Sequence, residues 1–101
     1  MAKIYVIKNK CNNKGYVWAT TRDIHERYNE HVRYSEKGSN IPIHEAIREL
    51  GKDNFYVELI DTCDDAIRLE LEAYFIDKLN TKIPNGYNFY AKGSSGFTGY
   101  T

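Results

Sequence analysis

The sequence predicts an α+β fold, in which a small three-stranded antiparallel or mixed sheet is flanked by three helices in the order β-β-α-α-β-α. Three observations support this prediction. The length of 101 residues suits one small domain. Two short runs rich in β-branched and aromatic residues lie on either side of an asparagine-rich turn, which is typical of a hairpin. Helical patterns then occupy three segments, and one alternating run separates the second from the third.

Local signals mark the ends of several of these elements. Thr20 or Thr21 can cap the first helix, with Asp23 as the capping-box partner. Pro42 suits a helix start, and Gly51 suits the position just after a helix end. The predicted strands are residues 3–7, 15–19 and 55–60, and the predicted helices are residues 22–34, residues 43–50 and a third helix from Asp61 or Thr62 to near Asn80.

The composition excludes several classes of protein. No G-x-G-x-x-G or Walker loop is present, which argues against nucleotide-cofactor chemistry. Cys11 and Cys63 form no C-x-x-C pair and are too few for a disulfide framework or a zinc site, so we expect reduced thiols and a cytoplasmic location. No apolar run approaches the length of a membrane span, and no signal peptide is visible.

The charge is unevenly distributed along the chain although the net charge is zero. Residues 1–52 contain 10 Lys and Arg against 6 Asp and Glu, whereas residues 53–101 contain 4 against 8. A basic first half is consistent with a domain that faces a polyanion on one side. Residues 91–101 are rich in Gly and Ser and are expected to be a flexible tail or the start of a linker after a domain that spans residues 1–90.

The first predicted helix carries charge on its inward face. Ile24, Arg27, Tyr28 and His31 follow the spacing i, i+3, i+4 and i+7, which places them on one side of a helix. A guanidinium in this position can extend along the apolar surface to water, pair with a structural carboxylate or bind a ligand. The remaining histidines, His25 and His44, are expected to lie on the surface.

The third predicted helix carries one inward carboxylate. Leu69, Ile76 and Leu79 are expected to form its core stripe, and Glu72 lies on or beside that stripe, whereas Glu70 is better placed for solvent. An inward glutamate requires a cation, because burial of an unpaired charge is unfavourable. A salt bridge with Arg27 and a divalent metal ion both remain possible at this point.

Short motifs spread along the chain resemble those of a known family. They are Lys3-Ile4-Tyr5, Tyr16-Val17-Trp18 after a gap of ten residues, Arg27 in DIHERYNEH, IHEAIRELGKDNF at residues 43–55, Glu72 in LELEAYFIDKLNT, and NGYN at residues 85–88. Each motif alone is weak, but their order and spacing together are specific. Over residues 3–90 the chain resembles the nuclease domain of the GIY-YIG family, especially the small phage-type homing endonucleases.

The resemblance implies an enzyme that hydrolyses DNA phosphodiester bonds with one divalent ion, Mg²⁺ or Mn²⁺. Glu72 would bind the metal, Arg27 would bind the scissile phosphate, and Tyr5 would be the general base. A tyrosine titrates near pH 10, so Tyr5 would need neighbouring positive charge to act near neutral pH. The implied catalytic residues are Tyr5, Tyr16, Arg27, His31, Glu72 and Asn88.

The remaining implied roles concern DNA and the support of the site. Tyr16 would bond the phosphate or the attacking water, His31 would share or orient the base, and Asn88 would support the site from behind. We expect both tyrosines, Arg27 and Glu72 to converge on one solvent-reachable hollow. The implied DNA-binding residues are Lys3, Lys14, Trp18, Arg22 and Arg27. In phage homing enzymes a nuclease domain is tethered to a separate DNA-binding region, so the resemblance also implies such a region beyond this chain.

Two positions depart from the family pattern. Lys3 replaces the first motif glycine, at a position that is loose in the family. Trp18 replaces the last motif glycine, where a missing side chain would let the DNA backbone approach. An indole there could obstruct DNA or stack on a base. Three functions therefore remain: a nuclease that Trp18 could weaken, a catalytically impaired DNA-binding module, and a structural domain with a buried pair between Arg27 and Glu72.

Overall fold

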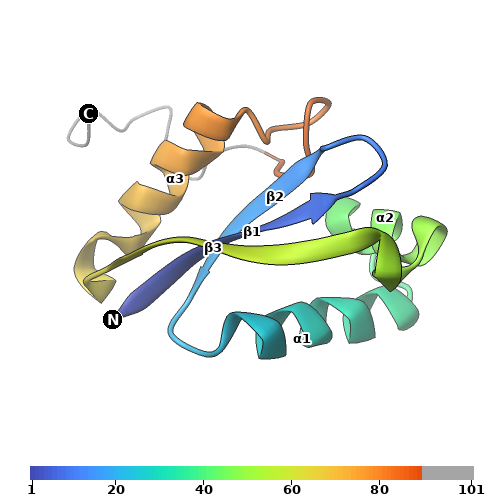
Figure 1. Ribbon diagram of the computed structural model, residues 1–101, viewed down its shortest axis with the longest axis horizontal. Helices are drawn as coiled ribbons and strands as arrows, with labels where there is room; N and C mark the ends of the chain where they lie inside the picture. Colours follow the sequence, from blue (N-terminus) through green and yellow to red (C-terminus); the bar gives the residue numbers. More distant parts are fainter. Residues whose placement is uncertain (90–101) are drawn as a thin grey trace.

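The computed structural model describes residues 1–89, and Figure 1 shows a sheet with helices on both faces. The predicted order β-β-α-α-β-α is confirmed. The strands are β1 (Ala2–Asn9), β2 (Gly15–Thr20) and β3 (Phe55–Cys63), and the helices are α1 (Ile24–Glu36), α2 (Pro42–Leu50) and α3 (Arg68–Leu79). Short 3₁₀ turns, Lys52–Asn54 and Asp65–Ile67, precede β3 and α3. The predicted tail, residues 91–101, lies outside the described residues.

The sheet has the order β2-β1-β3, and both pairings are antiparallel. In β1 and β2, Tyr5 lies opposite Trp18 and Ile7 lies opposite Tyr16, so these four side chains share one face of the sheet. The pairing of β1 with β3 shifts between Ile4 and Tyr5, which is a bulge in the ladder. Bulges often redirect side chains beside functional sites, and this one adjoins Tyr5.

The two faces of the sheet bury separate apolar clusters. Helix α3 packs on one face, and α1 and α2 cover the other (Figure 1). The cluster beneath α3 consists of Ala2, Ile4, Val6, Val17, Cys63, Leu71, Ala73 and Ile76. The cluster beneath α1 and α2 consists of Tyr5, Ile7, Tyr16, Val32, Ile43, Ile47, Phe55 and Tyr87. Tyr5 and Tyr16 therefore belong to the core and also face the helix that carries Arg27.

The start of α1 differs from the prediction. Asp23 is the N-cap, and its carboxylate accepts the backbone N–H of His25 at 2.9 Å. Thr20 is still part of β2, and its hydroxyl accepts the N–H of Arg22 at 3.0 Å in the turn before the helix. Because the strand continues through Thr20, the helix begins at Ile24 rather than near Arg22. Helix α2 begins at Pro42, one residue before the predicted start, and ends at Leu50 as predicted, with Gly51 after its end at φ 88°.

The region between β3 and α3 also differs from the prediction. β3 continues to Cys63, which pairs with Ala2, so the helix begins at Arg68 and not at Asp61 or Thr62. The predicted core stripe was wrong at two positions. Leu69 is 52% exposed and Leu79 is 42% exposed, because they occupy the two ends of the shortened helix.

A closing segment follows α3 at residues 81–88 and forms hydrogen bonds with the hairpin of β1 and β2. The N–H of Tyr87 donates to the carbonyl of Gly15 at 2.9 Å, and Asn9 donates to the Tyr87 hydroxyl at 2.9 Å. Gly86 passes so close to Thr81 that a Cβ on it would lie 2.3 Å from the Thr81 carbonyl oxygen. Only glycine fits this approach, which explains the glycine of the NGYN motif.

Candidate active site

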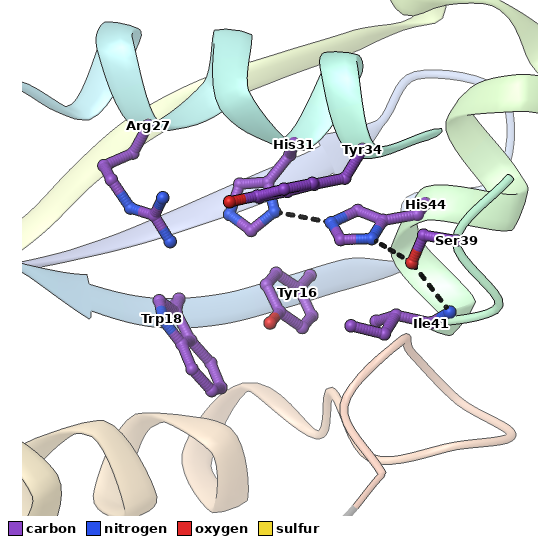
Figure 2. A pocket seen from close by; sticks show the side chains of 8 residues that line it. All are labelled: Tyr16, Trp18, Arg27, His31, Tyr34, Ser39, Ile41 and His44. Carbon is purple, nitrogen blue, oxygen red and sulfur yellow. Dashed lines mark hydrogen bonds between the residues drawn. The ribbon is translucent and has the colours of Figure 1, made fainter. Parts of the chain in front are cut away.

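A pocket of about 290 Å³ opens between β2, α1 and the loop into α2 (Figure 2). Its walls include the Trp18 indole, which stacks on the Tyr16 ring with centroids 5.5 Å apart and planes 11° apart. Charged and titratable groups reach the same space from the helices. The lining residues are Tyr16, Trp18, Arg27, His31, Tyr34, Ser39, Ile41 and His44. A concave, mostly apolar pocket with a few convergent polar groups is typical of a ligand site.

Tyr5 lies behind this lining. Its side chain is fully buried, and its hydroxyl lies 3.1 Å from Nε2 of His31. Burial raises the pKa of Tyr5, and the charge of Arg27, with a hydrogen bond from its guanidinium, opposes this without outweighing it. The sequence predicted that neighbouring positive charge would lower the pKa of Tyr5 enough for it to act as a base. The charge of Arg27 alone does not lower this pKa enough. A desolvated phenolate is disfavoured, so Tyr5 retains its proton near neutral pH.

Tyr16 lies on the pocket wall and is 6% exposed. Burial is the main reason that its pKa is raised, and the negative charges of ionised Tyr5 and of Glu72 act in the same direction. Tyr16 is thus a neutral hydroxyl near neutral pH. A neutral phenol at this position can donate a hydrogen bond to an anionic oxygen in the pocket.

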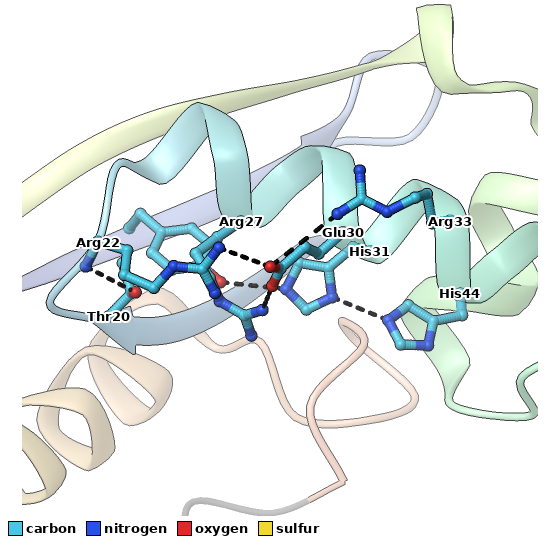
Figure 3. Close-up of polar contacts among 8 residues, drawn as sticks. Thr20, Arg22, Arg27, Glu30, His31, Arg33 and His44 are labelled. Atoms are coloured by element: carbon cyan, nitrogen blue, oxygen red, sulfur yellow. Dashed lines mark hydrogen bonds and ion pairs between the residues drawn. The ribbon is translucent and has the colours of Figure 1, made fainter.

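Arg27 pairs with Glu30, one turn further along α1. Glu30 also binds Arg22 at 2.6 Å and lies 4.0 Å from Arg33 (Figure 3). The hydrogen bond from Arg22 is the first cause that holds the pKa of Glu30 below its usual value, and Arg27 contributes to the shift. Three guanidinium groups and one carboxylate leave a net charge of +2 in this cluster, which suits it to attract phosphate.

Glu72 lies on the inward side of α3, as predicted, and is 3% exposed. Its charge raises the pKa of both Tyr5 and Tyr16, so it lies within electrostatic reach of the two phenols. Tyr16, Arg27 and His31 line the pocket, whereas Tyr5 and Glu72 do not. The predicted convergence of both tyrosines, Arg27 and Glu72 on one solvent-reachable hollow therefore holds for Tyr16 and Arg27 only, because Tyr5 and Glu72 are buried away from the pocket surface.

The described residues contain no cluster of three or more His, Cys, Asp or Glu side chains that could enclose a metal ion. A metal bound here would have Glu72 as its protein carboxylate and would take its other ligands from water and substrate oxygens. Mg²⁺ commonly binds in this manner, because it retains several waters and needs only one or two carboxylates. One carboxylate from Glu72, completed by water and substrate oxygens, therefore suits Mg²⁺ or the similar Mn²⁺.

Asn88 supports β2 from outside the pocket, at 3% exposure. Its Oδ1 accepts the N–H of Val17 at 2.9 Å and the hydroxyl of Thr81 at 2.8 Å, and its Nδ2 donates to the Val17 carbonyl at 3.0 Å. Val17 lies between Tyr16 and Trp18, so the Asn88 amide fixes the strand that carries two of the lining residues.

Comparisons with known proteins identify this arrangement. The model of the GIY-YIG catalytic domain matches residues 1–88. The chain belongs to the GIY-YIG family. A curated relative, "Intron-associated endonuclease 1" of Enterobacteria phage T4, is 38% identical over 89 residues. The match covers 84% of this chain and 35% of that relative, so the chain spans about a third of the relative's length.

Solved structures give the same assignment. The catalytic domain of intron endonuclease I-TevI matches with a TM-score of 0.73 and 32% identity, over 86% of this chain and 96% of that one. A mutant of the same catalytic domain matches with a TM-score of 0.77 and 32% identity, over 90% of this chain and 96% of that one. The family and the fold predicted from the sequence are confirmed, and the chain contains a GIY-YIG catalytic domain over residues 1–88.

The GIY-YIG fold does not gather all the predicted DNA-binding residues. Arg22, Arg27 and Trp18 lie around the pocket and the arginine cluster, and the Lys3 ammonium donates to the Arg22 carbonyl at 3.3 Å. Lys14 precedes Gly15, at the opposite end of the hairpin from the pairing of Lys3 with Thr20. The assignment of Lys14 to the same DNA surface therefore has no support from proximity.

His44 was wrongly expected at the surface, whereas His25 is exposed as predicted. His44 is 4% exposed, and its Nε2 lies 2.8 Å from Nδ1 of His31. It precedes Ile47 by three residues, a spacing that places both on one helix face, but its main partner belongs to α1 and is invisible to local pattern. Sequence reasoning also missed Glu30, Arg33, Tyr34, Ser39 and Ile41.

Proposed function

We propose that this GIY-YIG domain hydrolyses phosphodiester bonds of DNA with the help of one divalent ion, Mg²⁺ or Mn²⁺. The observation that carries the proposal is the meeting of Tyr16, Arg27 and His31 in one pocket, with Tyr5 hydrogen-bonded to His31 and Glu72 within electrostatic reach of both tyrosines. The names of the similar proteins, which are endonucleases, support the same reaction class. In the described residues no helix is long and apolar enough to cross a membrane.

Arg27 and Tyr16 are proposed to bind the scissile phosphate. The guanidinium offers a planar fork of donors that matches two phosphate oxygens. Glu30 holds that fork over the pocket side of α1, and its partners Arg22 and Arg33 add positive charge around it. Tyr16, neutral near pH 7, donates a hydrogen bond to an oxygen of the same phosphate.

Tyr5 and His31 are proposed to remove the proton of the attacking water. The Tyr5 hydroxyl and His31 Nε2 are 3.1 Å apart, within the range over which a proton can pass directly. Because burial raises the pKa of Tyr5, the phenol acts by passing on its proton as it gains another, not as a free phenolate. Asn88 keeps the β2 backbone in place while this occurs.

Glu72 is proposed to bind the metal ion. When bound, the ion supplies a Lewis acid that stabilises negative charge on the leaving oxygen. A cation bound there would also offset the charge of the carboxylate, which opposes an anionic substrate nearby. Its inward position on α3 and its influence on both phenols support this role.

Plasmid nicking tests this function. Supercoiled plasmid is incubated with the protein in Mg²⁺, in Mn²⁺ and in EDTA, beside Glu72→Gln and the matched control Glu70→Gln on the exposed side of α3. We expect metal-dependent nicking that Glu72→Gln abolishes and Glu70→Gln retains. Nicking in EDTA, or equal nicking by both variants, would contradict the proposed metal role.

A second candidate function is DNA binding without cleavage. The Trp18 indole covers the Tyr16 ring and is 36% exposed at the pocket mouth, where it could keep a phosphate away from Tyr16. A gel shift without nicking under all metal conditions would favour this function. The remaining alternative, a structural domain, predicts neither nicking nor a gel shift.

We further propose that the active protein is longer than this chain and acts in the cytoplasm. The chain spans 35% of the phage relative, so that relative has ample length for another domain. With zero net charge the domain alone has little attraction for DNA, and a separate DNA-binding region would supply it. Fusing such a region after Thr101 should raise DNA affinity without altering the metal dependence.

A further inference from the structure

A continuous hydrogen-bonded chain leads from the hydroxyl of Tyr5 to the rim of the pocket. The Tyr5 oxygen lies 3.1 Å from His31 Nε2, His31 Nδ1 lies 2.8 Å from His44 Nε2, and His44 Nδ1 lies 2.7 Å from the Ser39 hydroxyl. These four residues come from β1, α1, α2 and the loop between the two helices. Figure 2 shows the outer part of this chain, with the two imidazoles in line and Ser39 beyond them.

The direction of these hydrogen bonds follows from the donors at the inner end. The Arg27 guanidinium, which has only donors, lies close enough for its charge to act on the Tyr5 hydroxyl, so the Tyr5 oxygen faces a donor on that side. The Tyr5 proton then needs an acceptor in a fully buried position, and His31 Nε2 lies 3.1 Å from the Tyr5 oxygen.

A neutral imidazole with an unprotonated Nε2 carries its proton on Nδ1. His31 Nδ1 then donates to His44 Nε2, and His44 Nδ1 donates to Ser39. Burial, followed by the charges of His44 and Arg27, lowers the pKa of His31 to about 3. Both rings are therefore neutral near pH 7, as this arrangement requires, since burial also lowers the pKa of His44.

We propose that His44 is a positioning residue: it accepts the Nδ1 proton of His31 and thereby keeps His31 Nε2 free to take the proton of Tyr5. The catalytic consequence rests on the proposed nuclease function, whereas the tautomer of His31 does not. The Tyr34 ring contacts the His44 ring, with the two ring centroids 5.6 Å apart.

The proton transfers balance along the chain. Water gives one proton to the Tyr5 oxygen, and the Tyr5 O–H bond breaks as a bond to His31 Nε2 forms. His31 Nδ1 passes its proton to His44 Nε2, and His44 Nδ1 passes its own to Ser39, whose hydroxyl proton leaves to solvent. Every side chain gains one proton and loses one, so each ends neutral and hydroxide remains to attack phosphorus. Tyr5 need never exist as a free phenolate.

Nitrogen NMR of the imidazoles tests the tautomer without any DNA. In the ¹⁵N-labelled protein at pH 7, we expect His31 and His44 to be protonated at Nδ1 only. His44→Phe, which lacks an acceptor, should move His31 away from this single tautomer. His44→Gln, whose amide oxygen can reach the same place, should retain it, and so should the exposed control His25→Gln. The proposal is overturned if His31 is protonated at Nε2 in the unaltered protein. It is also overturned if the tautomer of His31 is the same in His44→Phe as in the unaltered protein.

Cleavage kinetics test the catalytic consequence. We expect His44→Phe to lower kcat by about tenfold or more with DNA Kd unchanged, as is typical when a partner that orients a reactive imidazole is removed. His44→Gln should recover most of the rate, and His25→Gln should equal the unaltered protein. Equal rates for all variants overturn the positioning role. An unaltered protein that cuts no DNA defeats the proposed function, while the NMR result still decides the tautomer.

Discussion

Asn88 forms hydrogen bonds with both backbone groups of Val17, at 2.9 Å from the N–H and 3.0 Å from the carbonyl. β2 is an edge strand, so Val17 has no strand neighbour on that side among the described residues. The amide supplies the donor and acceptor that such a neighbour would provide, and it does so between Tyr16 and Trp18. A single side chain therefore joins the closing segment to the strand that forms one wall of the site.

Asn88→Ala should destabilise the domain by about 2–4 kcal/mol, because both backbone groups of Val17 and the Thr81 hydroxyl lose a buried partner. Urea denaturation measures the change. The matched control is Asn85→Ala in the same segment, whose exposed amide should cost less than about 0.5 kcal/mol. Equal stability of the two variants would show that Asn88 has no special structural role.

Arg27→Lys should lower the cleavage rate by about tenfold or more, since an ammonium lacks the planar fork that binds two phosphate oxygens. Stability should change little, because Arg27 is partly exposed and its pair with Glu30 lies within one helix. The control is Arg33→Lys, which changes a more exposed guanidinium 4.0 Å from the same carboxylate. Single-turnover kinetics on plasmid distinguish the variants, and the same rate loss in both would argue for a general charge effect.

Trp18→Gly should increase the rate of plasmid nicking, because the indole stacks on Tyr16 and narrows access to its hydroxyl. The cost in stability should be about 2 kcal/mol, because glycine within a strand costs about 1 kcal/mol relative to alanine and the stacking on Tyr16 is also lost. Trp18→Phe keeps an aromatic wall and serves as the control. Nicking that remains unchanged in Trp18→Gly would mean that the indole does not obstruct the site, and slower nicking would instead favour a stacking role toward DNA.

The stability of the domain should fall as the pH drops from 7 to 5. The folded-state pKa of His31, about 3, lies below the value of about 6.5 for a free histidine, so the unfolded chain binds the proton first. The stability present above pH 6.5 is then lost at up to about 1.4 kcal/mol per pH unit. His44, whose pKa is also lowered by burial, adds to this loss in the same direction, and Glu30, whose pKa is lowered, does so only at more acidic pH.

Urea denaturation at pH 5, 6 and 7 measures this dependence. His31→Gln should reduce the loss of folding stability between pH 7 and pH 5 by about 2 kcal/mol. The variant lacks the histidine whose pKa is lower in the folded state than in the unfolded state. His25→Gln, on the exposed side of α1, should leave the loss as it is. If His31→Gln shows the full pH dependence, then His31 is not the group responsible.

The sequence predicted the elements whose signals are local. The hairpin, the bounds of α2 and the inward position of Glu72 follow from strand composition, from Pro42 and Gly51, and from helical spacing. The errors arose where pairing between distant segments extended an element. Thr20 remained in β2, and Cys63 paired with Ala2, so α1 and α3 both began later than their own residues indicated. The later start of α3 left Leu69 in the exposed first turn, whereas Leu79 is exposed as the last residue of the helix.

The sequence by itself determined the chemical groups of the site, because Tyr5, Tyr16, Arg27 and Glu72 stand in motifs with fixed spacing. Only the tertiary structure decided which groups touch. In the folded protein Arg27 pairs with Glu30, and the buried Tyr5 hydroxyl contacts His31. His44, from another helix, has its Nε2 2.8 Å from Nδ1 of His31. The physical reason is that periodicity reports which face of an element is buried, whereas hydrogen-bond partners and desolvation depend on how separate elements pack.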